Sequence, residues 1–321
     1  MKVNFFDKES VIKAFSELYG MNEGELIPLS YKANLEDDPT HYFLEHYPIQ
    51  LDMIDISDIE LHCKHITTSF DRMESFKKYG FQTLNKTLSQ ETPLKKFLSD
   101  RGISFDLEER KIIYNGKIIH LVEGDQECKE CFYGKECQYL KSIFSEKEPL
   151  GYRDFACPYR DSIKIIRSKL FHDKGEIEVH LSGSFKDVHD YSEVKYNPEF
   201  LVTLENMINK LFDEKVRLVR DWRNLTGGKY YCLEFDINIE DFEYITSSPQ
   251  NDWFWYNQFF DICANNYYSL EEVNKNFYGN LYLLGVGIQI ICDDIPVKYG
   301  QIKNEVEIPI QNVDIVEYSI K

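Results

Sequence analysis

The sequence predicts a protein of the α+β class, and three observations carry that prediction. Segments with the alternating pattern of strands lie toward both ends of the chain, whereas helical spacing of apolar residues dominates its middle. Of the 321 residues, 43% are hydrophobic and 15% aromatic, so the chain can bury a sizeable core and is not disordered throughout. Gly (16) and Pro (10) are few, and no linker rich in them marks a domain boundary.

A strand, a cap and a helix follow one another early in the chain. Residues 51–66 alternate imperfectly between apolar and polar positions, which predicts extended structure ending near His65. Thr68 and Ser69 are good N-cap residues for the helical pattern that follows, and Gly80 is placed to end that helix in the left-handed conformation. This unit is the best-defined local structure in the sequence.

The remaining elements are indicated by caps, turns and periodicity. Pro93, after the capping residue Thr92, predicts a helix over residues 94–100. Residues 111–121 read KIIYNGKIIHL, in which Asn-Gly between apolar runs favours a hairpin with a type I′ turn. Apolar periodicity predicts further helices over residues 11–19, 161–170 and 198–212. It predicts further strands over residues 230–237, 282–292, 304–310 and 313–320.

The charge balance limits the partners of the chain. It carries 37 Lys and Arg against 55 Asp and Glu, a formal net charge of −18, which argues against binding of nucleic acid or anionic membrane by the whole surface. This balance leaves room for a local basic groove. Two stretches either line such a groove or are ordinary solvated faces: Arg160, Lys164, Arg167 and Lys169, and Lys215, Arg217, Arg220 and Arg223.

Targeting signals and several common enzyme motifs are missing from the sequence. No apolar run approaches the roughly 18–20 residues of a membrane span, and the first residues lack the pattern of a secretory signal. We therefore expect no membrane partner and a cytoplasmic location. The motifs GxxxxGK[ST], GxGxxG, GxSxG and HExxH are absent, which argues against a P-loop NTPase, a simple Rossmann dehydrogenase, an α/β-hydrolase and a zincin.

Four of the eight cysteines cluster in one window of the chain, at Cys128, Cys131, Cys137 and Cys157. The CxxC spacing at its start lets two thiolates reach one tetrahedral zinc ion. We expect a structural zinc site in the subregion 128–157, because four thiolates leave no open position for catalysis. Reduced or redox-active thiols are the alternative, and His172 could replace one ligand.

The first candidate site residues lie where the early strand ends. His65 and Thr67 are two positions apart, so an extended chain presents a ring nitrogen and a hydroxyl on the same side. The alternative is a surface histidine followed by threonines that cap a helix. His62 is more simply a surface histidine.

The second candidate site is the acidic segment near the C-terminus. In an extended chain Glu305 and Glu307 share one face, while Val306 and Ile308 face the core. Pro309 indicates a strand edge or a bulge. The alternative is that the two carboxylates form only the solvated side of a strand.

Together the two segments resemble the ADP-ribosyltransferase superfamily. In its histidine-type members a first strand carries His, a further residue and Thr or Ser, as in His65-Ile66-Thr67. The helix that follows ends in an Ile-x-x-Gly-Leu-like turn, which FKKYGF at residues 76–81 matches loosely, and a late strand carries the catalytic glutamate in a Glu-Val-x-Ile-Pro context, as at residues 305–309. The resemblance covers these two short stretches.

The resemblance implies a fold and a set of site residues. The fold is a split antiparallel β core over residues 59–321, with a long helical, cysteine-bearing insertion at about 122–225 and residues 1–58 packed on the core. NAD is the implied substrate, with Glu305 or Glu307 as the catalytic carboxylate and with His65 and Thr67 binding ribose hydroxyls. The family's middle motif is assigned to Tyr230 or Tyr231, which could stack on nicotinamide, and less directly to Ser182-Gly183-Ser184.

The implied function is transfer of ADP-ribose from NAD to a macromolecular acceptor, either nucleic acid or protein. By analogy the chain would be a toxin or an anti-phage effector, with a neutralising antitoxin as partner. Three alternatives remain open: an NAD glycohydrolase on the same scaffold, a non-enzymatic zinc-stabilised interaction or immunity protein, and a metal-dependent nuclease that uses Asp190 with Glu193-Val194-Lys195.

Overall fold

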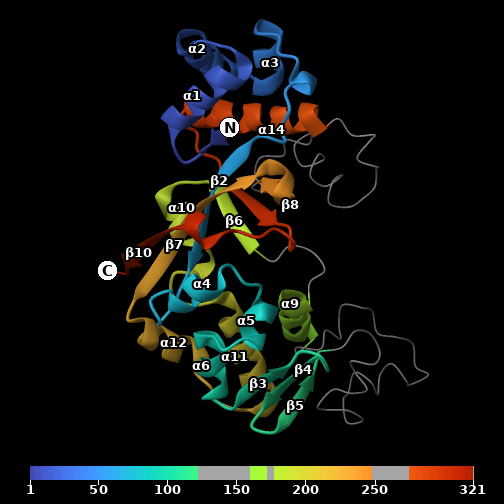
Figure 1. Cartoon of the computed structure of the whole chain (residues 1–321), viewed down its shortest axis with the longest axis vertical. Coiled ribbons are helices and arrows are strands. Elements are labelled where there is room, and N and C mark those ends of the chain that lie inside the picture. Colours follow the sequence, from blue (N-terminus) through green and yellow to red (C-terminus); the bar gives the residue numbers. More distant parts are fainter. Residues whose placement is uncertain (122–159, 172–176, 248–274, 321) are drawn as a thin grey trace, which may run out of the picture. The chain divides into compact units, whose positions relative to one another are not determined.

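The computed structural model describes residues 1–121, 160–171, 177–247 and 275–320 (Figure 1). It confirms the α+β class, because helices accompany sheets in which nearly all recorded strand pairs are antiparallel. The contacts divide the chain into two units. Unit 1 consists of Met1–Thr67, Lys174–Lys195 and Tyr231–Tyr318, and unit 2 of Thr68–Asp173, Tyr196–Tyr230 and Ser319–Lys321. The expected N-terminal segment 1–58 lies within unit 1, and the expected insertion 122–225 is divided between the two units.

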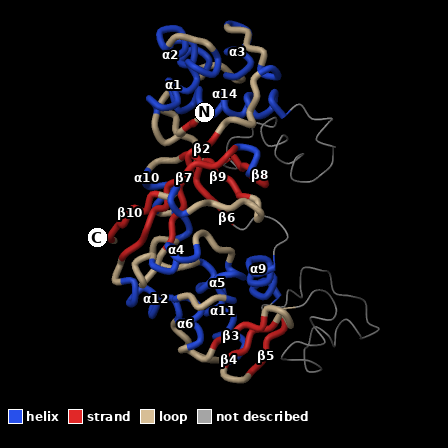
Figure 2. The backbone as a smooth tube through the Cα atoms, in the orientation of Figure 1, coloured by secondary structure: helices blue, strands red, loops and turns tan. Residues whose placement is uncertain are grey.

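One seven-stranded sheet organises unit 1 (Figure 2). Its strands follow one another in the order β10-β7-β2-β6-β9-β8, and β1 pairs in parallel with the first residues of β2. The recorded pairings of β2 with β6 and β7, and of β9 with β6 and β8, are antiparallel. The strands are β1 (Lys2–Val3), β2 (Glu60–Thr67), β6 (Ile177–Ser182), β7 (Lys229–Asn238), β8 (Phe242–Ser247), β9 (Lys298–Ile302) and β10 (Asp314–Ser319).

The two faces of this sheet differ in chemistry. Because successive strand residues point to opposite faces, Leu61 and Cys63 of β2 are buried on one face beside Phe235 of β7. The other face of the same two strands carries His62, Lys64, Glu234 and Asp236. The apolar face therefore supplies the core of unit 1, and the polar face carries its ionisable groups.

A helical group lies beside the sheet in unit 1 (Figures 1 and 2). Its central helix packs so closely on its neighbours that a Cβ added at Gly287 would lie 1.9 Å from Phe15, and one at Gly279 2.7 Å from Ile56. The side chain of Asn280 donates to the carbonyls of residues 51 and 54, at 3.0 and 2.8 Å. The group consists of α1 (Lys8–Tyr19), α2 (Glu23–Ala33), α3 (Pro39–His46), η1 (Leu51–Met53) and the central helix α14 (Lys275–Ile291).

The central helix contradicts one sequence prediction, the strand over residues 282–292. These residues read YLLGVGIQIIC, an apolar run that periodicity alone cannot assign to a buried strand or a buried helix. In the structure they belong to α14, which is apolar on nearly every side because α1, α2, α3 and η1 surround it.

Unit 2 has its own core and a three-stranded sheet, in the order β3-β4-β5. The predicted hairpin is confirmed as β4 and β5, with Asn115 (φ 48°) and Gly116 (φ 79°) both in the left-handed region that a type I′ turn requires. Its elements are α4 (Glu74–Tyr79), α5 (Leu84–Ser89), α6 (Pro93–Ser99), β3 (Ile103–Asp106), β4 (Lys111–Tyr114), β5 (Lys117–His120), α9 (Arg160–Phe171), α11 (Glu199–Phe212) and α12 (Leu218–Thr226).

Most helices predicted for unit 2 are confirmed, and one begins later than expected. Thr92 caps α6 by accepting from the Lys95 amide at 3.2 Å, and α9 and α11 match the expected ranges within two residues. The helix expected directly after Thr68 begins only at Glu74, because the chain first passes through left-handed residues. Thr68 instead accepts a hydrogen bond from Trp222, 2.9 Å away.

Candidate functional site

His65 and Thr67 lie at the C-terminal end of β2, as predicted. Nδ1 of His65 donates to the carbonyl of Glu178 on β6 at 2.8 Å, so Nε2 of the neutral ring is an acceptor. Burial lowers the pKa of His65 below its ordinary value, and the bond to Glu178 only partly opposes this. A neutral imidazole is therefore present at pH 7, and it can accept a hydrogen bond from a hydroxyl group.

The structure separates the two candidate tyrosines of β7. Tyr231 is paired directly with Thr67, and paired residues of an antiparallel ladder share a face, so Tyr231 lies on the face of His65 and Thr67. Tyr230 is the preceding residue and lies on the other face. The Tyr231 hydroxyl donates to Glu317 of β10 at 3.2 Å. Of the two, Tyr231 is the one that the strand geometry brings to the predicted site.

Glu305 and Glu307 lie in the loop between β9 and β10, so the strand predicted over residues 304–310 is wrong. Both glutamates are exposed, whereas Ile308 is buried. Exposed and buried side chains thus alternate as predicted, although the segment is not a strand of the sheet. Backbone bonds close a turn instead, with the amide of Val306 donating to the carbonyl of Lys303 at 3.2 Å. Pro309 cannot donate to a ladder, which is consistent with the departure of the chain from the sheet. The last predicted strand, over residues 313–320, is confirmed as β10.

The sheet topology brings the two predicted segments to one end of unit 1. Strands β2 and β9 both border β6, so they lie about 10 Å apart at the usual strand spacing. Ile177, the first residue of β6, pairs with Ile302, the last of β9, and Lys64 pairs with His180 in antiparallel fashion. The end of β2 and the end of β9 are thus at the same end of the sheet. Glu305 follows three positions after Ile302.

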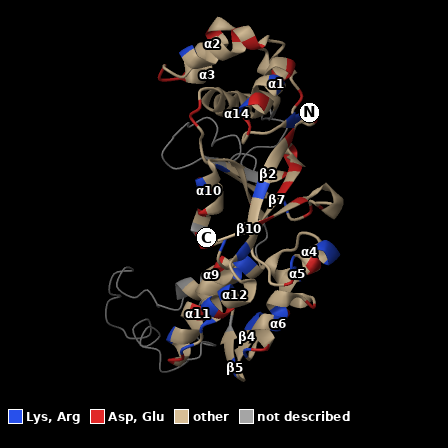
Figure 3. Ribbon diagram, turned by 90° about the vertical axis from the view of Figure 1, so that its left-hand side faces the viewer, with Lys and Arg blue, Asp and Glu red and all other residues tan. Residues whose placement is uncertain are grey.

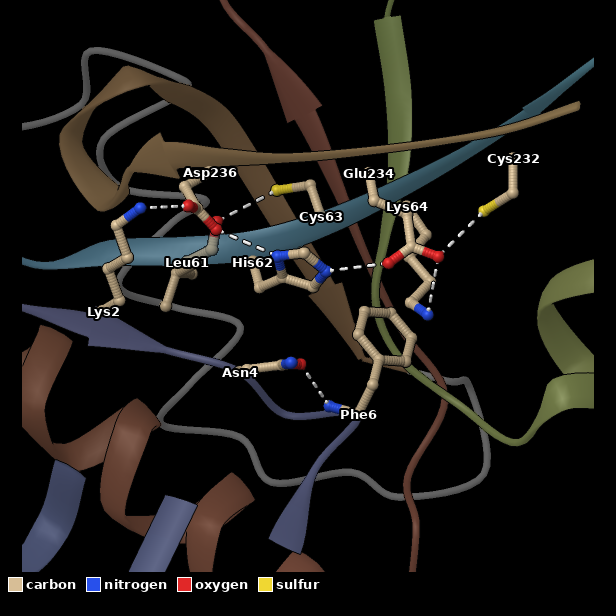
Figure 4. A network of polar contacts seen from close by, with 10 residues as sticks. All are labelled: Lys2, Asn4, Phe6, Leu61, His62, Cys63, Lys64, Cys232, Glu234 and Asp236. Atoms are coloured by element: carbon tan, nitrogen blue, oxygen red, sulfur yellow. Dashed lines mark hydrogen bonds and ion pairs between the residues drawn. The ribbon is translucent and has the colours of Figure 1, made fainter. Parts of the chain in front are cut away.

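A network of charged side chains on the opposite face was not predicted (Figure 4). His62 lies between two carboxylates, with Nδ1 2.9 Å from Asp236 and Nε2 3.4 Å from Glu234. Lys64 contacts Glu234 at 3.2 Å, and Lys2 contacts Asp236 at 2.6 Å. These pairs depend on the register of β2 against β7, strands separated by some 170 residues, and no local pattern in the sequence reveals that register.

The network balances its own charges. Partial burial alone would raise the pKa of Glu234 and of Asp236, but Lys64 and His62 for the first, and Lys2 and His62 for the second, leave both pKa values below their ordinary range. The two carboxylates are therefore ionised at neutral pH and tied to cations. We interpret this network as a cross-strand support for the β2–β7 pair.

The other proposed residues are engaged in local structure or lie outside the described residues. Ser182 donates to the carbonyl of Pro296 at 2.5 Å, and Ser184 caps α10 (Phe185–His189). Asp190 of the nuclease alternative forms an ion pair with Lys195, which lowers the pKa of that aspartate. The proposed metal ligands lie outside the described residues: Cys128, Cys131, Cys137, Cys157 and His172.

The described residues contain neither a metal-binding group nor a membrane-spanning helix. No three His, Cys, Asp or Glu side chains in that part of the chain are grouped so that they could hold a metal ion. Nor is any helix there of sufficient length and apolarity to cross a membrane. Comparison with protein-family models, with curated proteins and with solved structures found no match to this chain.

Proposed function

We propose that the chain is an ADP-ribosyltransferase that moves ADP-ribose from NAD to a macromolecular acceptor. One observation carries the proposal: the His65-x-Thr67 end of β2 and the Glu305 loop, some 240 positions apart in sequence, follow the same end of one sheet. The resemblance of both segments to the family's motifs supports the same assignment. As a toxin or anti-phage effector, such an enzyme would act on acceptors of another cell or a virus.

For the transfer of ADP-ribose, the protein has to bind NAD and hold a carboxylate in a fixed position. The bond between nicotinamide nitrogen and ribose C1′ breaks, and nicotinamide leaves with the electron pair. The acceptor's nucleophilic atom then forms a bond to C1′ and loses its proton to solvent. Positive charge develops on the ribose ring in between, as it does in glycoside cleavage. A carboxylate held beside that ring stabilises the transition state more than the ground state.

Each residue of the proposed site has a role that fits its geometry. Glu305, or Glu307 two positions on, supplies the carboxylate that accepts a hydrogen bond from a ribose hydroxyl. Neutral His65 accepts from a ribose hydroxyl through Nε2, and Thr67 adds its own hydroxyl on the same face. Tyr231 is buried, with 3% of its surface exposed, and its hydroxyl donates to Glu317, so it supports the strand that carries Thr67 and does not offer its ring to nicotinamide.

Hydrolysis of NAD on the same scaffold is the second candidate, and the exposure of Glu305 and Glu307 favours it. Exposed carboxylates leave water free to approach the ribose carbon, and water then takes the place of the acceptor. We also propose a structural zinc ion on Cys128, Cys131, Cys137 and Cys157. It would have no part in either reaction, because the transfer itself needs no metal.

Labelled NAD tests the proposal directly. The full-length protein is incubated with cell extract and with NAD that carries the label in its adenylate half, and nicotinamide release is followed in parallel. Transfer predicts a labelled macromolecule, and hydrolysis predicts free nicotinamide with no label attached. Glu305→Gln should lower nicotinamide release about 10²–10³-fold, the usual cost of removing one group that stabilises transition-state charge.

The matched control is Asp314→Asn, which neutralises another exposed carboxylate a few residues away. It should leave nicotinamide release unchanged, and all variants should retain the unfolding midpoint of the parent protein. If Glu305→Gln and Glu307→Gln both release nicotinamide at the parental rate, the proposed site is wrong.

A further inference from the structure

The two units differ sharply in charge. The residues of unit 1 include 11 Lys and no Arg against 33 Asp and Glu, whereas those of unit 2 include 26 Lys and Arg against 22 Asp and Glu. All nine arginines of the chain belong to unit 2. A polyanion is therefore repelled by unit 1 and attracted only to unit 2.

Cations of unit 2 form a row along α12, which we call the α12 basic stripe (Figure 3). Its arginines recur every third residue, a spacing that keeps neighbouring side chains on one side of a helix. The opposite side of α12 is buried through Leu218 and Trp222. The stripe consists of Lys215, Arg217, Arg220 and Arg223, of which the first three are exposed.

The helix beneath the stripe is firmly held within unit 2. Trp222 contacts the rings of Phe70 and Phe97 edge-on, with centroids 5.1 Å away in both cases, and its indole N–H donates to Thr68 at 2.9 Å. A buried aromatic of this size anchors the helix strongly. The stripe is therefore presented on a rigid support and needs little ordering when it binds a ligand.

Three carboxylates in the neighbourhood of the stripe accept hydrogen bonds or form ion pairs, one of them with Arg220 of the stripe itself. Asp221 accepts from Arg101 and from Arg220, both at 3.4 Å, and Glu205 accepts from the amide of Val219 at 2.9 Å. Glu214 lies 3.8 Å from Lys117. Within the described residues, neither Lys215 nor Arg217 forms an ion pair. Lys215 and Arg217 thus retain positive charges, whereas that of Arg220 is partly balanced by Asp221.

Arg217 lies at the N-terminal end of α12. It occupies the N-cap of α12, and the side chain of Glu205 accepts from the amide of Val219 in the first turn of the helix. A cation is unfavourable there, because the helix N-terminus carries a partial positive charge of its own. An anion bound beside Arg217 would remove this repulsion.

Arg223 adds an aromatic surface at the other end of the stripe. Its guanidinium lies 4.8 Å from the ring centroid of Tyr196, and its Nε donates to Asn197 at 2.9 Å. Both contacts fix the plane of the guanidinium, which can then contact a phosphate in bidentate fashion. A row of cations beside a tyrosine is typical of surfaces that follow a nucleic-acid backbone.

We propose that unit 2 binds a nucleic acid along the α12 basic stripe, and that this nucleic acid is the acceptor of the transfer. The second half rests on the proposed function, whereas binding does not. A nucleic acid fits better than an acidic protein, because its phosphates recur regularly along the chain, as the cations do along α12. It also fits the absence of arginine from the acidic unit 1, because a polyanion is then attracted to unit 2 and not to unit 1.

Binding is measured without NAD, by fluorescence anisotropy of labelled single-stranded DNA, single-stranded RNA and duplex DNA. The salt concentration is varied from about 50 to 200 mM, because each phosphate contact contributes about 0.7–0.9 to the slope of log affinity against log salt. The triple variant Lys215→Gln, Arg217→Gln, Arg220→Gln should bind at least about tenfold more weakly and lose about 2–3 from that slope.

The matched control removes three exposed lysines from unit 1, with Lys13→Gln, Lys32→Gln and Lys186→Gln. It lowers the net charge of the chain equally and should bind the oligonucleotides with nearly the affinity and salt dependence of the parent protein. If both variants weaken oligonucleotide binding equally, net charge alone determines the affinity, and the proposal that the stripe is the binding surface is wrong. The stripe variant must also keep the parental unfolding midpoint; if it does not, the single substitution Arg217→Gln is used.

The outcomes separate this proposal from the proposed function. Oligonucleotide binding that depends on the stripe, combined with unchanged nicotinamide release in both Glu305→Gln and Glu307→Gln, overturns the transferase and leaves the binding surface standing. Label found on protein but not on nucleic acid overturns the nucleic-acid acceptor and leaves the transferase standing. Binding to phosphatidylserine vesicles without binding to any oligonucleotide overturns the partner class.

Discussion

His180 illustrates how burial controls the chemistry of a single residue. It lies on β6 with 5% of its surface exposed, and its ring contacts those of Tyr191 and Tyr299 at 5.3 and 5.0 Å. Nδ1 has no hydrogen-bond partner among the described residues. Burial, helped by the nearby His65 and His189, lowers the pKa of His180 to about 4. The ring is thus neutral in the folded protein throughout the physiological range.

This shift predicts an acid-sensitive fold. In the unfolded state the pKa of His180 is near 6.5, so below that pH the unfolded state binds a proton that the folded state does not. The contribution of His180 to the free energy of unfolding is therefore fully present above pH 6.5 and is lost as the pH decreases toward 4. Between pH 7 and pH 5 the free energy of unfolding should fall by about 2 kcal/mol through this residue. Urea titrations at both pH values measure it. His180→Phe keeps a ring in the aromatic contact and should lose most of that dependence; the same pH dependence in both proteins would contradict the assignment.

At the scale of elements, α14 is the clearest departure from the sequence prediction, and its packing can be tested. Gly287→Ala places a methyl group 1.9 Å from a carbon of Phe15. Such overpacking in a core costs about 1–3 kcal/mol, which urea unfolding measures. Phe15→Leu in the same chain removes the clashing atoms. The double variant should therefore lose less free energy of unfolding than the sum of the losses in the two single variants. Strict additivity would show that α1 and α14 do not meet there.

The elements that could be predicted have turn residues, helix caps or a clear apolar periodicity in their own sequence. The two segments that were predicted wrongly lack such a signal or depend on a distant partner strand. The hairpin and α6 carry their turn and cap chemistry within a few residues, at Asn115-Gly116 and Thr92-Pro93. Residues 282–292 are apolar all along and so lack the periodicity that distinguishes helix from strand. The segment 304–310 has the alternation of a strand but no partner strand, because pairing is decided by the rest of the sheet.

The candidate site divides in the same way. His65 and Thr67 were predictable because one strand places them on one face, and Tyr231 joined them only through its pairing with Thr67. The network around His62 needs the same long-range register, which the sequence does not express locally. The loop conformation of Glu305 depends on where β9 ends, and that in turn depends on the strands that flank it.

At the scale of the whole molecule, charge is the most uneven property of the chain. Unit 1 holds 33 acidic residues and only 11 basic ones, so its carboxylates repel one another across the unit. The ion pairs among its described residues, such as Lys8 with Asp293 at 2.8 Å, neutralise only a part of this excess. Salt screens the repulsion among exposed charges more than it weakens those few pairs.

Salt should therefore stabilise the protein. Raising the NaCl concentration from about 10 to about 150 mM shortens the screening length from roughly 30 to 8 Å, and the free energy of unfolding should rise on the order of 1 kcal/mol. Thermal unfolding would then shift upward by about 2–4 °C. Glu36→Gln and Asp37→Asn together remove two exposed acids, so they should stabilise the protein at low salt and reduce the stabilisation that salt adds. Lys32→Gln, in the same region, should destabilise the protein at low salt and increase the stabilisation that salt adds. A protein that becomes less stable as salt is added would show that its ion pairs outweigh the repulsion, and the acidic excess of unit 1 would then have to be neutralised by contacts beyond those described.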